Sequence, residues 1–151
     1  MNMNGKATIV ISPYRAANGR SVEQHVRHAE GLCLLLARAG VPTFASHLYA
    51  TRFLDDANPV EREAGIAISK CWIARADRLA VWDPWGISEG MAAEIAWAEA
   101  LNEDRAERVN ALFAAGSAPG LIAPSPIQIH YFTNAEVPEW NGTFTREGEF
   151  R

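Results

Sequence analysis

The sequence predicts a single α/β domain in which helices cover a central parallel sheet. Short apolar runs at residues 6–11, 41–45 and 79–82 are long enough for strands and too short for helices. Helix-like segments separate these runs, and strands that alternate with helices form parallel sheets with right-handed crossovers. The chain has 151 residues, of which 48% are hydrophobic, so it is long enough for one such domain with a buried core.

The first half of the chain carries clear signals for helix boundaries. Ser21, with Gln24 three residues later, forms a capping-box pattern, and apolar residues then recur every three or four positions along one helix face. Gly40 is typical of the residue that follows a helix end. The next apolar run should form the second strand, and residues 47–57 are expected to form a loop or a broken helix.

Two further helices are marked by the residues at their N-termini. Asn58 followed by Pro59 indicates an N-cap with a proline in the first turn, and we expect this helix to run to about Arg75. Ser88 is expected to cap a third helix, which should run to about Asn102 or beyond.

The last third of the chain is less regular. Residues 127–132 alternate between apolar and polar side chains and predict a late strand. Before it, the sequence allows more helix over 105–115, and then a Gly- and Pro-rich connection with a weak strand near Leu121. The tail at 134–151 is polar and irregular. We therefore expect one domain spanning residues 1–151, with its core at about 6–132.

Charge and hydropathy exclude several classes of protein. The net charge of −4 does not suit a protein that neutralises nucleic-acid phosphates, so no nucleic acid is expected as a partner. There is no apolar run of membrane-spanning length and no signal-peptide pattern, so we expect no membrane partner and a cytoplasmic location. Cys33 and Cys71 are expected to be free, buried thiols. His25 and His28 lack further ligands at metal-binding spacing, so no metal is expected.

Ligands of parallel α/β sheets bind outside the carboxyl ends of the strands. This rule selects the loops at residues 12–18, 46–58 and 83–90, which hold most of the chain's unusual residues. The His47–Asp56 region suits acid–base chemistry or a solvated loop, and Trp85 suits stacking on a base or simple packing. The candidates for the site are Ser12, Tyr14, Arg15, His47, Asp55, Asp56, Asp83, Trp85, Ser88 and Gly90.

An anion site is predicted where the third helix begins. Ser88 and Gly90 place a hydroxyl group and free N–H groups at a helix N-terminus, which attracts anions such as phosphate. Arg15 offers a forked cation suited to phosphate or carboxylate. The alternatives are simple capping by Ser88 and an ordinary turn with a surface Arg15.

Glu94 is the strongest catalytic candidate. It falls within an apolar helical stripe formed by Met91, Ile95 and Ala98, so its side chain should point toward the packed side. A carboxylate is costly in such a place unless it is paired or used in chemistry. The alternative is a half-exposed glutamate, or one paired with an arginine.

Taken together, these motifs resemble the nucleoside 2-deoxyribosyltransferase family and its relatives, the nucleoside-monophosphate N-glycosidases. The resemblance covers about residues 6–132 and is greatest to a phage-type branch of the family. The segments that carry it are Ser-Pro-Tyr-Arg at 12–15, His47 with Phe-Leu-Asp-Asp at 53–56, Ala-Asp-Arg-Leu at 76–79 and, most specifically, Ser88-x-Gly90-x-x-x-Glu94-Ile95-x-x-Ala98.

The resemblance implies a flavodoxin-like three-layer sandwich with a central parallel sheet of about five strands. It also implies that Glu94 attacks the sugar of a (deoxy)nucleoside or its 5′-monophosphate and forms a covalent glycosyl intermediate. Ser88 and Gly90 would then lie at the sugar or 5′ end of the ligand. Many transferases have a glycine-containing loop where this chain has Ser-Pro-Tyr-Arg at 12–15, and an arginine at this place, Arg15, is more similar to the monophosphate hydrolases. The sequence therefore allows either a nucleoside or a nucleotide as the substrate, and either transfer or hydrolysis as the reaction.

The implied reaction assigns further roles without a metal or an organic cofactor. The leaving base needs a proton, and Asp83, Asp55 and Asp56 are the candidates to supply it. Tyr14 is a candidate to orient Glu94. The alternative from another class of protein is a nucleotide-binding module without turnover.

A homodimer or higher homo-oligomer is also expected. Relatives of the family share site residues between subunits. The helix rich in Ala and Trp at residues 92–100 presents more apolar surface than one sheet face need cover. The alternative is that Trp97 packs under residues 104–125 of its own chain.

Overall fold

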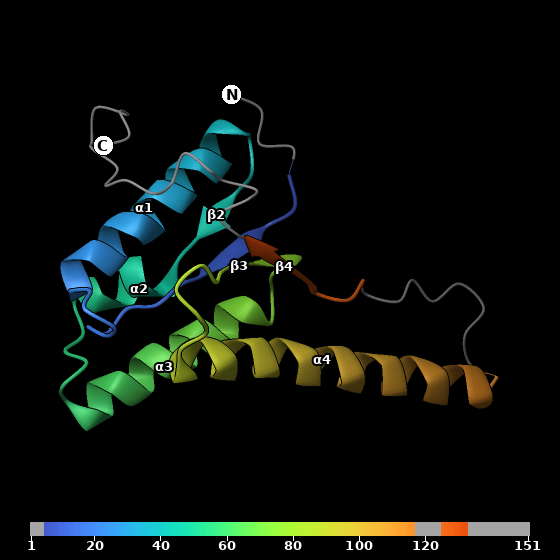
Figure 1. Ribbon diagram of the computed structural model, residues 1–151. Helices are drawn as coiled ribbons and strands as arrows, with labels where there is room; N and C mark the ends of the chain where they lie inside the picture. The colour runs from blue at the N-terminus through green and yellow to red at the C-terminus, as the bar shows by residue number, and fades with distance from the viewer. Residues whose placement is uncertain (1–4, 117–124, 133–151) are drawn as a thin grey trace.

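A computed structural model describes residues 5–116 and 125–132 of the chain (Figure 1). It contains a four-stranded parallel sheet in the order β2-β1-β3-β4, with helices on both faces. The predicted α/β domain with a parallel sheet is thus confirmed, with four strands in the described part of the chain where about five were expected. The elements are β1 (Thr8–Ile11), α1 (Val22–Arg38), β2 (Thr43–Phe44), α2 (Ser46–Tyr49), the 3-10 helix η1 (Ala50–Arg52), α3 (Pro59–Ile73), β3 (Arg78–Trp82), α4 (Glu89–Ala114) and β4 (Gln128–Phe132).

The two faces of the sheet bury separate sets of apolar side chains. On one face, Ile9 of β1 and Leu79 of β3 pack with residues of α3 and α4, including Met91. On the other face, Val10 of β1 packs with Leu32 of α1. This alternation is what a strand buried on both sides produces, since successive side chains point to opposite faces. The chain therefore forms three layers, with α1 on one side and α3 and α4 on the other (Figure 1).

The predicted helix starts are confirmed at the level of single hydrogen bonds. Ser21 and Gln24 form the reciprocal capping box of α1. The Asn58 side chain accepts from the Val60 N–H, with Pro59 as the first residue of α3. Ser88 is the N-cap of α4 and accepts from a backbone N–H of the first turn. Because α4 begins shortly after β3 ends, its capped N-terminus lies at the carboxyl edge of the sheet.

Several element ends differ from the expectations. β2 is shorter than the apolar run from which it was predicted, and α3 ends at Ile73 rather than near residue 75. The two helical stretches expected on either side of residue 104 are one continuous α4 of 26 residues. No Gly or Pro interrupts it between Met91 and Ala114, so nothing in the sequence ends the helix earlier. The weak strand expected near Leu121 and the tail at 134–151 lie outside the described residues.

The broken helix expected after the second strand is confirmed. Residues 46–52 form one turn of α2 followed directly by η1, and turns then lead to α3. The two cysteines are free, as expected, but only Cys33 is partly buried, and burial raises the pKa of its thiol to about 11. The expectation that Cys71 is buried was wrong, since it lies on an exposed side of α3.

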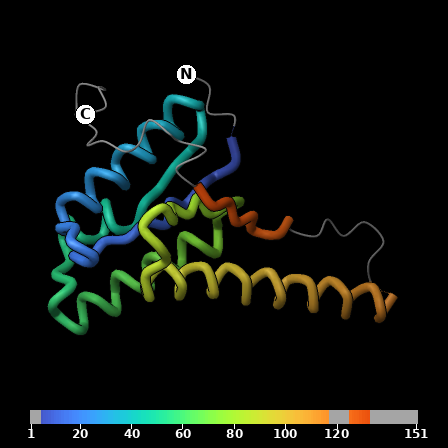
Figure 2. The backbone as a smooth tube through the Cα atoms, in the orientation of Figure 1, coloured from blue at the N-terminus to red at the C-terminus, as the bar shows by residue number. Residues whose placement is uncertain are grey.

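The search for membrane-spanning helices covers the described part of the chain. None of the helices found there combines the length and the apolar character that crossing a bilayer requires. The longest, α4, extends well past the edge of the sheet (Figure 2).

Candidate active site

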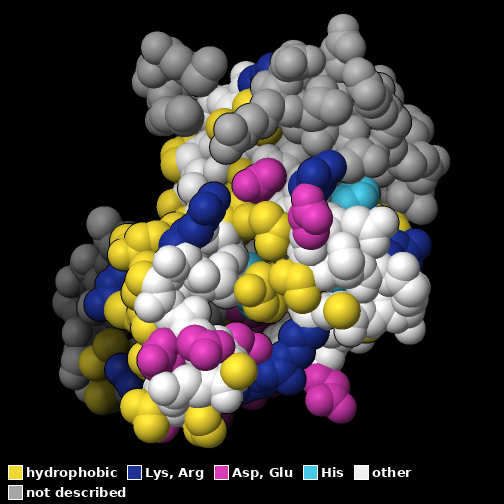
Figure 3. Space-filling model, turned by 90° about the vertical axis from the view of Figure 1, so that its left-hand side faces the viewer, with side chains coloured by type: hydrophobic (Ala, Val, Ile, Leu, Met, Phe, Trp, Pro, Cys, Tyr) yellow, Lys and Arg dark blue, Asp and Glu magenta, His cyan; other side chains and the backbone are white. Residues whose placement is uncertain are grey.

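A cavity of about 670 Å³ opens at the carboxyl edge of the sheet. Its walls come from the loops that follow β1, β2 and β3 and from the facing sides of α3 and α4. Figure 3 shows the face on which it opens, where basic and acidic side chains surround a hollow. The loops selected from the sequence therefore do meet at one site.

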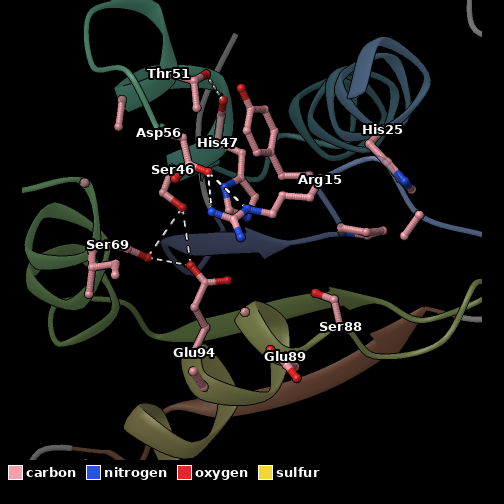
Figure 4. Close-up of a pocket in the computed structure, with 18 of the residues that line it drawn as sticks. Arg15, His25, Ser46, His47, Thr51, Asp56, Ser69, Ser88, Glu89 and Glu94 are labelled. Carbon is pink, nitrogen blue, oxygen red and sulfur yellow. Dashed lines mark hydrogen bonds and ion pairs between the residues drawn. The ribbon is translucent and has the colours of Figure 1, made fainter. Parts of the chain in front are cut away.

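Glu94 lies in the wall of this pocket and is only 4% exposed. Its Oε1 accepts a 2.6 Å hydrogen bond from the Ser69 hydroxyl and a longer one of 3.4 Å from the Ser46 hydroxyl (Figure 4). Its Oε2 has no hydrogen-bond partner among the described residues. The carboxylate is thus fixed through one oxygen, while the other is buried without a hydrogen bond from the described residues.

The positions of Glu94, Ser69 and Ser46 on their helices explain how the three side chains meet. Met91, Ile95 and Ala98 are buried against the sheet, so the same side of α4 carries Glu94 inward. On α3, Ser69 shares the buried side with Ile73, four residues later. Ser46 comes just after β2, where the chain leaves the sheet. Three elements distant in sequence therefore converge on one carboxylate.

The surroundings of the Glu94 carboxylate differ from both alternatives that the sequence left open, a half-exposed side chain and a pair with an arginine. It is neither half-exposed nor, among the described residues, paired with an arginine; the serines of α2 and α3 hold one of its two oxygens. Tyr14 was the candidate to orient Glu94, but it makes no hydrogen bond to it. Instead, the Tyr14 ring stacks on His47 with their centroids 5.2 Å apart, and both rings line the pocket.

The start of α4 borders the pocket through Ser88, Glu89 and Gly90. The Ser88 hydroxyl accepts from the Met91 N–H at 3.3 Å, which satisfies one of the free donors of the first turn. A side chain added at Gly90 would meet only the Ser88 hydroxyl, at 4.0 Å, so the space in front of this turn is open. Its remaining N–H groups can therefore be approached by an anion from the pocket.

Arg15 is tied to the loop that follows β2. Its Nε and Nη2 donate to Asp56 Oδ2 at 3.1 and 2.9 Å, and Arg62 of α3 donates to the same oxygen at 3.3 Å. All three residues line the pocket. Two guanidinium groups share a single carboxylate, so one positive charge is left uncompensated within this group. In Figure 4 the Arg15 and Glu94 side chains both point into the pocket.

Aromatic and basic side chains gather at the other end of the pocket. The Arg20 guanidinium lies over the Trp85 ring, 4.1 Å from its centre. The rings of His25 and His28 also contact Trp85. Burial and then the charge of Arg20 lower the pKa of His25. Burial, followed by the charges of His25 and Arg20, lowers the pKa of His28 to about 4. Both imidazoles are therefore neutral at pH 7.

Three of the residues predicted from the sequence do not line the pocket. Ser12 is buried where β1 ends. Asp55 is used in its own turn, since its carboxylate accepts from the Ala57 N–H and its N–H donates to Glu61. Asp83 begins the turn after β3, where its carbonyl accepts from the Gly86 N–H. Of the three aspartates considered as proton donors, only Asp56 borders the pocket.

Among the pocket-lining residues that sequence reasoning missed are Ser46, Ser69, Arg62, Arg20 and His25. Ser69 carried a weak signal, because it is a polar residue four positions before a buried isoleucine on one helix side. His25 carried a similar signal on the buried side of α1, together with Ala29. The other three were ordinary polar residues of helix or loop, and only the fold brings them to the pocket.

The fold and the site define an α/β protein with a buried carboxylate at the carboxyl edge of a parallel sheet. The chain belongs to the family described as a domain of unknown function, DUF7768, whose model matches residues 6–108. That match spans β1 to most of α4 and so includes every pocket-lining residue. No curated protein matches the chain. In the described part of the chain, no group of three or more His, Cys, Asp or Glu residues is arranged to hold a metal ion.

Proposed function

We propose that this protein cleaves or exchanges the N-glycosidic bond of a (deoxy)nucleoside or its 5′-monophosphate, with Glu94 as the nucleophile. The observation that carries the proposal is the geometry of Glu94: a buried carboxylate in the pocket wall, with one oxygen fixed by Ser69 and the other without a partner in the described part of the chain. A carboxylate in an apolar wall is costly, and that cost is offset when the group acts on a ligand.

The reaction then proceeds by two displacements at the anomeric carbon. Glu94 Oε2 donates an electron pair to C1′ and forms a C–O bond while the C1′–N bond breaks. The base leaves with the bonding electrons and takes up a proton from water; Asp56 borders the pocket but is ion-paired with Arg15 and Arg62. Water or the nitrogen of a second base then attacks C1′ and releases the Glu94 carboxylate. Every group in this scheme is a side chain or substrate, so no cofactor is required.

The architecture supports the resemblance on which the proposal builds. Flavodoxin-like sheets have the strand order 2-1-3-4-5, and the described strands follow the first four of these positions. In such sheets the ligand lies beyond the carboxyl ends of the strands, where this pocket is found. We therefore assign the domain to the flavodoxin-like class, with a nucleoside or nucleotide as its small-molecule partner.

A 5′-phosphorylated nucleoside is the form of the substrate favoured by the anion-binding features. Arg15 and the first turn of α4 border the same pocket as Glu94. A panel of nucleosides and 5′-monophosphates, incubated with and without a second free base, separates the possibilities. Free base released without an acceptor indicates hydrolysis, and a new nucleoside indicates transfer. Binding without any product would instead support the nucleotide-binding module.

Arg15→Ala is expected to raise KM for a 5′-monophosphate about 10-fold, with little change in kcat. A charge-assisted contact is worth roughly 1.5–3 kcal/mol, and the 63% exposure of the Arg15 side chain places it at the lower end of that range. Steady-state kinetics on a nucleoside and its monophosphate provide the measurement. An equal loss on both substrates would show that Arg15 serves another purpose, such as holding Asp56.

We also propose that the protein forms a homodimer. Leu112 and Phe113, near the end of α4, are 38% and 62% exposed, and this end of the helix extends past the sheet (Figure 2). Trp97 does not contribute to that surface, because it packs against the core and beneath Lys70 of α3. Light scattering at micromolar concentration is expected to give twice the mass of one chain. An active species of 16.5 kDa would contradict the dimer.

A further inference from the structure

His25 is buried at one end of the pocket with its hydrogen-bonding capacity unused. It is 3% exposed, and neither ring nitrogen has a hydrogen-bond partner among the described residues. A buried polar group without a partner costs about 1–3 kcal/mol. His25 lines the pocket, and in Figure 4 it lies at the opposite end from Ser69. A ligand that reaches this end would remove that cost.

Arg20 supplies a positive charge beside His25. Its guanidinium lies 4.1 Å from the centre of the Trp85 ring, which His25 contacts edge-on at 5.4 Å. Within the described residues it forms no ion pair, whereas Arg15 and Arg62 are both bonded to Asp56. Burial lowers the pKa of the His25 imidazole, and the positive charge of Arg20 lowers it further. As far as the described residues show, this end of the pocket therefore offers a guanidinium group without an ion pair and an imidazole without a hydrogen bond.

The two anion-attracting parts of the pocket are close together along the chain. Trp85 precedes Ser88, the N-cap of α4, by three residues, a stretch that spans at most about 11 Å when fully extended. Gly86 turns the chain between them with φ of +84°, which glycine adopts without strain. Trp85, which contacts both Arg20 and His25, and the first turn of α4 therefore lie close together along the wall of one pocket.

We propose that the Arg20–His25 end is a second anion subsite, and that the substrate is a nucleoside with two or more phosphates at its 5′ end. The first phosphate lies at the start of α4, and the next one contacts the Arg20 guanidinium and accepts an N–H of the His25 imidazole. Trp85 holds the guanidinium in place from behind. This choice of substrate class rests on the proposed function, but the subsite itself is tested by binding alone.

Isothermal titration calorimetry measures binding of inorganic phosphate, inorganic pyrophosphate, and deoxyadenosine 5′-mono- and diphosphate. Wild-type protein is expected to bind pyrophosphate, and to bind the diphosphate at least about 10-fold more tightly than the monophosphate, the factor for one charge-assisted contact. Arg20→Gln and His25→Phe should each remove this preference without weakening the monophosphate. His25→Phe keeps an aromatic ring, slightly larger than imidazole, against Trp85 and removes both nitrogens.

Arg27→Gln is the matched control, because Arg27 is also a cation of the α1 region but pairs with Glu23 on an exposed surface. It should leave the diphosphate preference unchanged. The subsite is overturned if wild type binds neither pyrophosphate nor the diphosphate more tightly than the single phosphates, or if Arg27→Gln causes the same loss as Arg20→Gln. Failure of the proposed function would look different: the diphosphate preference would persist, but Glu94→Gln would leave turnover unchanged.

Discussion

Glu94→Gln is expected to lower turnover by several powers of ten and to leave the fold intact. Glutamine has nearly the same shape and keeps an oxygen that can accept the 2.6 Å hydrogen bond from Ser69. It lacks the negative charge that attacks C1′, so the covalent step is lost. Turnover is measured with whichever member of the nucleoside and nucleotide panel the wild-type protein cleaves.

Glu99→Gln is the matched control for that substitution. Glu99 lies on an exposed side of the same helix, one turn beyond Glu94, and does not line the pocket. Its replacement removes one negative charge from α4 without changing the site, and turnover should stay near the wild-type value. Turnover of Glu94→Gln close to wild type would contradict the assignment of the nucleophile.

Ser69→Ala is expected to lower kcat about 10- to 100-fold while KM changes little. The Ser69 hydroxyl donates to the ionised Glu94, and a hydrogen bond to a charged group is worth roughly 1.5–3 kcal/mol. Ser46 alone, at 3.4 Å, holds the carboxylate more weakly, so it would sample orientations in which Oε2 does not face C1′. Steady-state kinetics that separate kcat from KM provide the measurement.

Ser69→Thr distinguishes positioning from a general loss of stability. Threonine keeps the hydroxyl group at the same place on α3, so kcat should recover toward the wild-type value. Thermal unfolding of both variants provides the second readout. If Ser69→Ala changes KM and kcat equally, or if Ser69→Thr shows no recovery despite normal stability, Ser69 does not act through Glu94.

The sequence predicted those parts of the fold that depend on neighbouring residues. Ser21, Asn58 and Ser88 were placed correctly as helix caps, because a cap is decided by a hydrogen bond within three residues. The inward direction of Glu94 followed in the same way from the spacing of buried residues around it.

The parts that the sequence did not predict depend on contacts between distant segments. Ser46 and Ser69 bond Glu94 across 48 and 25 residues of chain, and no local pattern marks such a pairing. Asp55 and Asp56 are adjacent and chemically alike, yet only Asp56 meets Arg15 and Arg62 at the pocket. The difference lies in which way each side chain turns in the loop, which is set by the bond from the Ala57 N–H to Asp55.

The most direct test of the account is to trap the glycosyl enzyme. A substrate analogue with fluorine at C2′ slows breakdown of the intermediate, because fluorine destabilises the positive charge that develops on the sugar in the transition state. Intact-mass measurement followed by peptide mapping then locates the adduct. The account predicts one sugar adduct per chain, on the peptide that contains Glu94, and none in Glu94→Gln. An adduct on another residue, or one that persists in Glu94→Gln, would contradict it.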